Sequence, residues 1–382
     1  MHGLMIAKLL LLDKPQVRKD TCRMPPKHAI EAVTHPDPYP YYRSLRTQRP
    51  LFFDEALGLW VASGHAAVSA AFAHPQLLVR PPAEPVPAAL LDTSAGEVFA
   101  LLVRMTDGAF HAAHKPAVEE GAKRWTLAEV ARASEAATRD LRERCDANGF
   151  MAQLPVRTMA RLLQVPQPEL EDTCRSVQQF VACIAPGAPA QAVSEGAQAA
   201  AALMAQGRAL GLAAAQAANR IALMQQSLDA TAALLGHTAL MLRAEPVQAE
   251  ASHVSLEAMR AFVAEVERYC APTQNTRRFA GEALTLAGHE IAAGQGVLLV
   301  LASANHDAEL NPEPDRFDAQ RSASRSMGFG EGRHGCPGAL IAIEIVASCV
   351  RQLCTEGRFD SFFGAQAGFR PLGNIRAPLF AN

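Results

Sequence analysis

The sequence predicts a mainly α-helical protein with small β-sheets, and three observations lead to this fold class. Apolar residues recur at helical spacing in several long segments, above all 219–243, 255–269 and 339–353. Two runs between residues 50 and 62, and several between 281 and 301, are short and bounded by turn residues, which is typical of short strands. No internal repeat or linker divides the chain, so residues 35–382 are expected to form one domain after a poorly defined leader, residues 1–34.

The composition argues against several classes of function. The chain has 382 residues, of which 49% are hydrophobic and 19% are charged, and its formal net charge is −2. This near-neutral balance is ordinary for a globular protein and gives no support for nucleic acid or an anionic membrane as a partner. The apolar stretch 4–12 is interrupted by Lys8 and is too short to cross a bilayer. We therefore expect a soluble, cytoplasmic monomer.

Several further elements can be placed in chain order. Proline turns and a short helix follow His35, strands are expected at 50–54 and 58–62, and another helix begins near residue 63. Residues 77–96 are rich in proline and lack periodicity, which predicts a loop. Asp107 is well placed to cap a helix in which His111 and Lys115 share one face. Segments 151–165 and 168–184 are amphipathic, and the alanine-rich segment 185–218 favours more helix.

The eight cysteines include no C-x-x-C pair and no cluster at the spacing of a zinc site. All except Cys336 are interpreted as free thiols in a reducing compartment. Cys336 stands in a glycine-rich stretch whose main chain can approach a large flat ligand closely. Pro337 suits the first helical position, which predicts that Cys336 lies at a helix N-terminus, where the metal-binding thiolate is favoured. The alternative is a buried structural cysteine in a glycine-rich turn.

The stretch Phe329-Gly-Glu-Gly-Arg-His-Gly-Cys-Pro-Gly338 resembles the haem-binding signature of the cytochrome P450 family. The family's aromatic residue, spaced glycine, basic residue, cysteine and final glycine correspond to Phe329, Gly332, His334, Cys336 and Gly338. The resemblance extends over about residues 37–380 and implies a single triangular-prism domain. In that fold, haem b is buried between the long central helix and the helix that follows the cysteine. Cys336 would then be the axial ligand of the iron.

The resemblance also implies which residues contact the haem. His111, Lys115, Arg278 and His334 would neutralise its two propionates, with Lys115 at a place where the family has arginine. Lysine keeps the charge but loses the bidentate fork. Taken alone, His111 and Lys115 would be interpreted as solvated residues on a helix surface. The other haem contacts are expected from Ala230, Met327, Phe329, Gly330, Pro337, Gly338 and Ala342.

The central helix departs from the family pattern. The family's acid followed by threonine corresponds to Asp229 and Ala230, so alanine stands where threonine usually takes part in proton delivery. Thr231, Ser227 or Gln226 would have to hold a water in its place. Asp229 is interpreted either as the catalytic acid or as a carboxylate bonded to nearby backbone.

Glu265 and Arg268 stand three residues apart and resemble the family's Glu-x-x-Arg, a buried pair that braces the haem loop. Pairs with this spacing also occur on many helix surfaces, so the tetrapeptide alone does not decide between the two. The segment 271–280 that follows resembles the strand that passes over the haem, and it contains Arg278 as the better candidate for a propionate contact and Arg277 as the alternative.

The function implied by the resemblance is that of a haem-thiolate monooxygenase. It would insert one oxygen atom from O2 into a small molecule, largely hydrophobic because the central helix is apolar. Electrons would come from a ferredoxin and its NAD(P)H-dependent reductase, because the chain has no flavin or iron–sulfur signature. Ala230 favours an alternative, a peroxide-using enzyme or a catalyst of oxidative coupling or rearrangement. A catalytically silent haem-binding scaffold is a third possibility, against which the intact loop around Cys336 argues.

Overall fold

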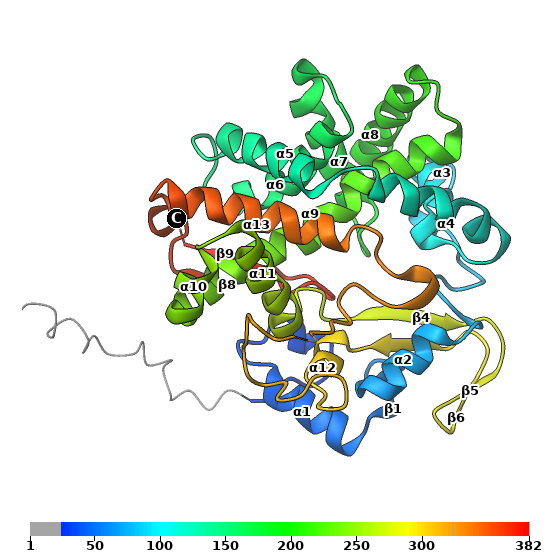
Figure 1. Ribbon diagram of the computed structural model, residues 1–382. Helices are drawn as coiled ribbons and strands as arrows, with labels where there is room; N and C mark the ends of the chain where they lie inside the picture. Colours follow the sequence, from blue (N-terminus) through cyan, green and yellow to red (C-terminus); the bar gives the residue numbers. More distant parts are fainter. Residues whose placement is uncertain (1–23, 323, 382) are drawn as a thin grey trace, which may run out of the picture.

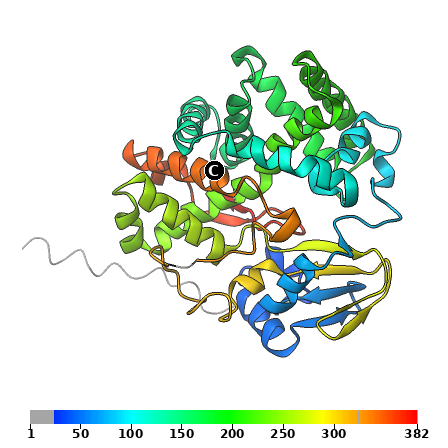
Figure 2. The same cartoon turned by 45° about the vertical axis from the view of Figure 1, so that its right-hand side comes forward.

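The computed structural model describes residues 24–322 and 324–381. Figures 1 and 2 show a larger helical part and a smaller part that holds the main β-sheet. Residues 1–23 of the predicted leader lie outside the described residues. Within residues 24–34, Glu31–Thr34 forms a 3-10 helix, and Ala29 and Ala32 are buried in a cluster with Tyr42. None of the described helices combines the length and the apolar character that a membrane span requires.

The smaller part is built on a five-stranded sheet in the order β1-β2-β7-β4-β3. Its strands are β1 Leu51–Asp54, β2 Leu59–Ala62, β3 Leu77–Leu78, β4 Thr276–Ala280 and β7 Gly296–Leu299. The helices of this part are α1 Tyr39–Gln48, α2 His65–Ala73 and α12 Leu301–Asn305. β1 and β2 correspond to the strands expected at 50–54 and 58–62, and they pair antiparallel. The strands predicted in 281–301 are also present, as the hairpin of β5 Leu284–Leu286 with β6 His289–Ile291 and as β7, which runs antiparallel to β4 but parallel to β2.

The larger part contains most of the helices. They are α3 Ser94–Ala100, α4 Gly108–Lys123, α5 Leu127–Leu141, α6 Ala147–Leu162, α7 Leu170–Cys183, α8 Ala190–Ala209, α9 Ala214–Ala244, α10 Pro246–Ser252, α11 Leu256–Cys270, α13 Ala339–Thr355 and α14 Phe359–Phe362. Near the C-terminus, β8 Gln366–Phe369 pairs antiparallel with β9 Pro378–Phe380. Shorter 3-10 helices are formed by Ala88–Leu90, Val103–Met105, Gln167–Glu169 and Gly332–His334.

The central helix is longer than its apolar periodicity indicates. α9 has 31 residues and begins at Ala214, five residues before the predicted start. The side chain of Gln216 accepts a hydrogen bond from the Ala213 N–H at 3.0 Å, which satisfies one of the free donors at this helix end. The alanine-rich segment before it is helical as predicted, with α8 ending only a few residues earlier.

The predicted loop over residues 77–96 needs correction. It contains the two-residue strand β3 and a 3-10 helix, and α3 already begins at Ser94. The Thr93 hydroxyl caps α3 by accepting a hydrogen bond from the Gly96 N–H at 3.1 Å. The high proline content of this segment hides the short threonine-capped helix at its end.

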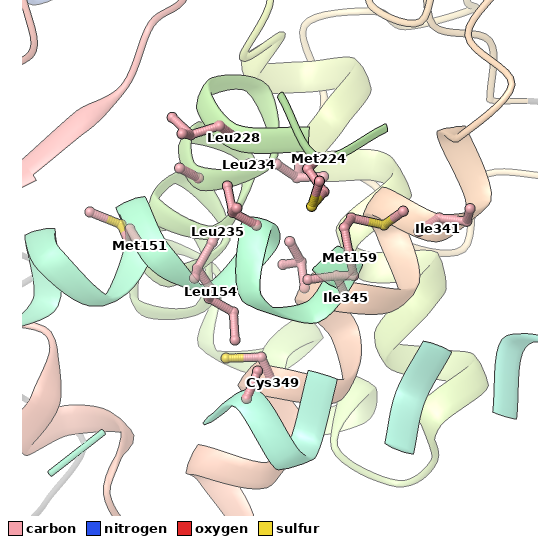
Figure 3. Close-up of a cluster of buried hydrophobic side chains, with 14 of the residues drawn as sticks. Met151, Leu154, Met159, Met224, Leu228, Leu234, Leu235, Ile341, Ile345 and Cys349 are labelled. Atoms are coloured by element: carbon pink, nitrogen blue, oxygen red, sulfur yellow. The ribbon is translucent and has the colours of Figure 1, made fainter. Parts of the chain in front are cut away.

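Helices α6, α9 and α13 pack together and form the main hydrophobic core. Figure 3 shows side chains of all three helices meeting there: Met151, Leu154 and Met159 from α6, Met224, Leu228, Leu234 and Leu235 from α9, and Ile341, Ile345 and Cys349 from α13. Burying these apolar surfaces fixes the central helix against the helix that follows the cysteine loop. The same core therefore positions both elements of the predicted site.

A buried ion pair on α11 connects the helical part to the cysteine loop. Arg268 is 0% exposed and donates two hydrogen bonds to Glu265, at 2.8 and 2.7 Å. It also donates to the carbonyl oxygens of Pro314 at 2.9 Å and Arg316 at 3.2 Å. One guanidinium thus orders the segment that enters the cysteine loop.

A second buried carboxyl lies beside the same loop. Burial raises the pKa of Glu267 to about 7, although the Ser326 hydroxyl and Arg268 act to lower it. Gly328 passes so close that a Cβ there would lie 2.0 Å from Glu267 Oε1. Only glycine therefore fits at position 328 without moving Glu267.

We expect the Arg268→Met variant to lose about 3–5 kcal/mol of unfolding free energy, because it leaves the Glu265 carboxylate buried without its main partner. The exposed Arg316→Met variant, which breaks only solvated pairs, is expected to lose less than about 1 kcal/mol. Urea unfolding followed by circular dichroism measures both. Similar midpoints for the two variants would show that the buried pair has no special importance for stability.

We expect Glu267 to make the protein less stable as pH rises. Between the ordinary pKa of 4.5 and the folded value of about 7, the unfolded chain releases this proton while the folded chain keeps it. The cost grows through this window and reaches roughly 3 kcal/mol above it. Urea unfolding at pH 5 and pH 8 should therefore show Glu267→Gln gaining stability relative to the unmodified protein at the higher pH. Glu257→Gln, at an exposed position of α11, is the matched control, and an equal gain there would refute the assignment.

Candidate functional site

The cysteine loop is a tight, hydrogen-bonded turn. The Cys336 N–H donates to the carbonyl oxygen of Phe329 at 2.8 Å, and the Gly330 N–H donates to that of Met327 at 2.8 Å. Gly330 has φ +68°, a left-handed conformation that favours glycine. These bonds fold the loop back on itself and leave the Cys336 side chain exposed.

The start of this turn is anchored to the core. Met327 is 1% exposed, and its N–H donates to Asn305 Oδ1 at 2.7 Å. The side chain of Asn305 in turn donates to the carbonyl oxygen of Arg268 at 2.9 Å and to the Ser326 hydroxyl at 3.1 Å. The loop is therefore tied to α11 through one asparagine, a residue that sequence analysis did not single out.

Helix α13 begins three residues after the cysteine. Its N-cap residue is Gly338, so Pro337 precedes the helix instead of occupying its first position as predicted. The Ala342 N–H donates to the Gly338 carbonyl at 2.9 Å in the first turn. Burial raises the pKa of the Cys336 thiol, while the Gly338 N–H, Lys115 and Arg104 lower it. The surroundings of the sulfur thus contain donors and cations that favour a thiolate.

The predicted propionate contacts gather around this loop. The imidazole rings of His111 and His334 lie 4.4 Å apart, and Lys115 Nζ donates to the Gly335 carbonyl at 2.8 Å. Arg278 is 7% exposed and donates to the carbonyl of Arg277 at 2.8 Å. Burial lowers the pKa of Arg278 to about 10. Four cationic or titratable bases therefore come from α4, β4 and the loop itself.

Asp107 does not cap α4 with its side chain, in contrast to the prediction. It occupies the N-cap position but its carboxylate instead accepts from the Val79 N–H at 2.8 Å and from His334 Nε2 at 2.9 Å. Burial would raise the pKa of Asp107, but these contacts and Arg333 lower it overall. Asp107 therefore orients His334, while the buried His111 Nε2 has no partner within the described part of the chain.

Arg104 belongs to the same cluster and was not predicted. Desolvation lowers its pKa, and Cys336 raises it. Arg104 and Cys336 are both partly accessible to solvent. Loss of hydration is nevertheless the largest cause of the lowered pKa of Arg104 and of the raised pKa of Cys336. No spacing links Arg104 to the cysteine in the sequence, so it carries no local signal there.

The predicted proton-delivery residues of α9 are in different environments. Asp229 accepts a hydrogen bond from Arg370, with 3.0 Å between Oδ1 and the guanidinium nitrogen, so its partner is a distant side chain and not the nearby backbone. Ser227 donates to the Met224 carbonyl at 2.7 Å in its own helix, and Gln226 is exposed. Thr231 is 3% exposed.

Ala230 lies against the segment between β8 and β9. It packs on a small cluster of Ala233, Ile375, Ala377 and Leu372. Arg370 belongs to the same segment, and its N–H donates to the Ala377 carbonyl at 2.9 Å. At this point the central helix and the segment between β8 and β9 meet through an ion pair beside an apolar patch.

Comparison with known proteins supports the same region. Residues 241–353 match the family model described as Cytochrome P450. A linalool 8-monooxygenase from Pseudomonas putida is 32% identical over 133 residues, which are 32% of this chain and 33% of that protein. A vitamin D(3) 25-hydroxylase from Pseudonocardia autotrophica is 39% identical over 115 residues, 30% of this chain and 28% of that protein. The aligned part of the chain thus spans about a third of the length of these curated relatives.

The fold is shared over a greater length than the sequence. The crystal structure of P450BioI in complex with an acyl carrier protein ligated to hexadec-9Z-enoic acid superposes with a TM-score of 0.76 at 21% identity. The superposition covers 92% of this chain and 97% of that chain, and it confirms the predicted fold class. The family-model match contains α11, the strands β4 to β7 and the whole cysteine loop, but neither α4 nor the part of α9 that holds Asp229 and Ala230. Residues 241–353 thus resemble the cytochrome P450 family in sequence, and the chain as a whole has the fold of the P450 structure it superposes on.

Proposed function

We propose that this protein is a haem-thiolate monooxygenase that inserts one oxygen atom from O2 into a small, largely hydrophobic molecule. The observation that carries the proposal is the accessible Cys336, held by a tight loop and faced by an excess of basic side chains. A structural cysteine in a glycine-rich turn would be packed and would need no such surroundings.

The residues present fit a haem group. The basic side chains near Cys336 and its loop are Arg104, Arg278, Lys115, His111 and His334. Two carboxylates contact this cluster among the described side chains, Asp107 at His334 and Glu119 at 3.7 Å from Lys115 Nζ. The buried, unpartnered His111 Nε2 is a free hydrogen-bonding atom in the same place. Two propionates would supply the missing negative charge and the missing partner.

Each residue of this cluster has a distinct role in the proposal. Cys336 would ligate the iron, while Arg104, Arg278 and His111 would bind the propionates. Lys115 already holds the loop through the Gly335 carbonyl, and His334 is oriented by Asp107. When bound, a haem with a thiolate ligand would supply the oxidising chemistry for a substrate.

Proton delivery falls to Asp229 in this proposal. A carboxylate on the central helix can pass a proton only when its oxygens are free to accept one. Arg370 holds Asp229 in the present conformation, so their ion pair has to loosen for transfer. Both side chains are partly exposed, at 38% for Arg370 and 27% for Asp229, which keeps the strength of this pair modest.

Electrons are proposed to come from an external ferredoxin and its NAD(P)H-dependent reductase. The protein itself is proposed to work as a monomer in the cytoplasm. The residues described by the structure include no group of three or more Cys, His, Asp or Glu side chains able to hold a metal ion. The proposal of a separate donor rests on the sequence, which carries no flavin or iron–sulfur signature.

The peroxide-using alternative is favoured by one specific observation. Ala230 has no hydroxyl, and it packs against apolar residues where the family pattern has threonine. A peroxide already carries the protons and electrons that O2 has to receive, so this route depends less on proton delivery along α9.

We expect the Cys336→Ser variant to lose the thiolate-type carbon monoxide difference spectrum of the reduced, haem-loaded protein, because a hydroxyl does not replace thiolate as the ligand. Cys354→Ser, at a partly buried free cysteine, should keep that spectrum. Absorption spectroscopy with haem content measured in parallel provides the readout. An unchanged spectrum in Cys336→Ser would disprove the axial assignment.

We expect Asp229→Asn to lower turnover with NAD(P)H, ferredoxin and reductase by roughly a hundredfold, the usual size of a general-acid contribution. The assay follows oxidation of a hydrophobic compound chosen because it shifts the haem absorption on binding. Turnover with hydrogen peroxide should be almost unchanged in the same variant. Glu257→Gln controls for the loss of a carboxylate elsewhere. If Asp229→Asn affects neither reaction and peroxide supports the faster turnover, the alternative function is the correct one.

A further inference from the structure

A cavity of about 560 Å³ lies away from the cysteine loop, where α4 and α6 meet the start of α9. This volume is within the usual range of small-molecule sites. Its apolar lining consists mainly of Val118, Trp125, Leu162, Leu163, Leu210, Leu212 and Leu223. None of the residues assigned above to the haem or to proton delivery lines it.

The short connection between α8 and α9 leaves this cavity open. Only residues 210–213 join the two helices, and Gly211 turns the chain with φ +74°. A Cβ at Gly207 would lie 2.5 Å from the Cβ of Ala217, so α8 and α9 approach each other closely. The chain therefore reverses without covering the first turns of α9, and Leu210 remains 60% exposed at the edge.

Two arginines line this apolar space without an acid to balance them. The Arg124 guanidinium lies 4.2 Å from the ring centre of Trp125, and Arg220 stands on the first turns of α9. None of the lining residues is acidic, and neither arginine forms an ion pair within residues 24–322 and 324–381. Burial lowers the pKa of Arg220 and the like charge of Arg124 lowers it further, so an anion placed there would relieve an unfavourable arrangement.

Gln164 adds a polar group at a position that favours glycine. It follows the end of α6 with φ +58°, and the N–H groups of Gln164 and Val165 donate to the carbonyls of Arg161 and Ala160, each at 2.9 Å. This is the arrangement of a Schellman helix end, where glycine is the usual left-handed residue. Glutamine instead brings an amide donor to the cavity lining, at a cost in backbone strain.

We propose that this cavity binds an amphiphilic carboxylate such as a medium-chain fatty acid. The carboxylate pairs with Arg124 and Arg220 and accepts from the Gln164 amide, while the alkyl chain lies along the leucines and Trp125. Charge complementarity selects an anion, and the apolar walls select a chain rather than a small ion. The site goes beyond the proposed oxidation and does not require Cys336.

Fluorescence of Trp125 tests the proposal directly. The chain has two tryptophans, so Trp60→Phe leaves Trp125 as the only emitter. Dodecanoate added to the full-length, haem-loaded Trp60→Phe protein should produce a saturable change. Arg124→Gln and Arg220→Gln should each weaken binding by about tenfold, the effect of losing a charged hydrogen bond. Arg132→Gln, at an exposed position of α5, should bind like the parent.

Three further measurements separate this site from the haem site. Gln164→Gly should weaken dodecanoate binding without lowering stability, because it removes the amide and relieves the left-handed strain. Cys336→Ala should bind dodecanoate as the parent does, so a failure of the proposed oxidation leaves this test intact. Isothermal titration with dodecan-1-ol and with acetate should show binding at least about tenfold weaker than with dodecanoate. The proposal is overturned if neither Arg124→Gln nor Arg220→Gln weakens dodecanoate binding. It is also overturned if acetate binds as tightly as dodecanoate.

Discussion

The cysteine loop keeps its place because a single buried guanidinium is fully satisfied. Arg268 neutralises Glu265 and donates to the carbonyls of the segment that enters the loop. Its own carbonyl accepts from Asn305, which also holds the Met327 N–H. Because a charge without partners is very costly inside a protein, this network has essentially one arrangement. The position of Cys336 relative to α9 and α4 follows from it.

Local sequence patterns were sufficient for the helices that form the core. Apolar periodicity located α9, α11 and α13, since each buries a continuous stripe, and alternation located β1 and β2. Apolar periodicity did not locate α5. The buried stripe of this helix, which includes Val130 and Leu141, is narrow, and the rest of its surface is largely charged or polar. The start of α3 was hidden by the prolines before it, because the cap that starts that helix depends on one threonine.

The candidate site could be predicted only in part, because its residues come from distant segments. The fixed spacing of the cysteine loop identified Cys336, and the four bases expected near it do lie around the loop. Arg104, Asn305 and Arg370 carry no local signal, since their importance depends on the chain segments they meet in space. The same holds for Asp107, whose side chain crosses to His334 instead of capping its own helix.

The length of α9 makes it a stiff element that connects two distant parts of the protein. At about 1.5 Å per residue, its 31 residues form a rod of roughly 45 Å, and its 214–235 portion contains neither glycine nor proline. Arg220 and Asp229 are thus fixed to one stiff body about 13 Å apart along its axis. A displacement or small rotation at the Arg220 end would therefore be transmitted along the helix to Asp229. It would reach the segment between β8 and β9 through the ion pair of Asp229 with Arg370.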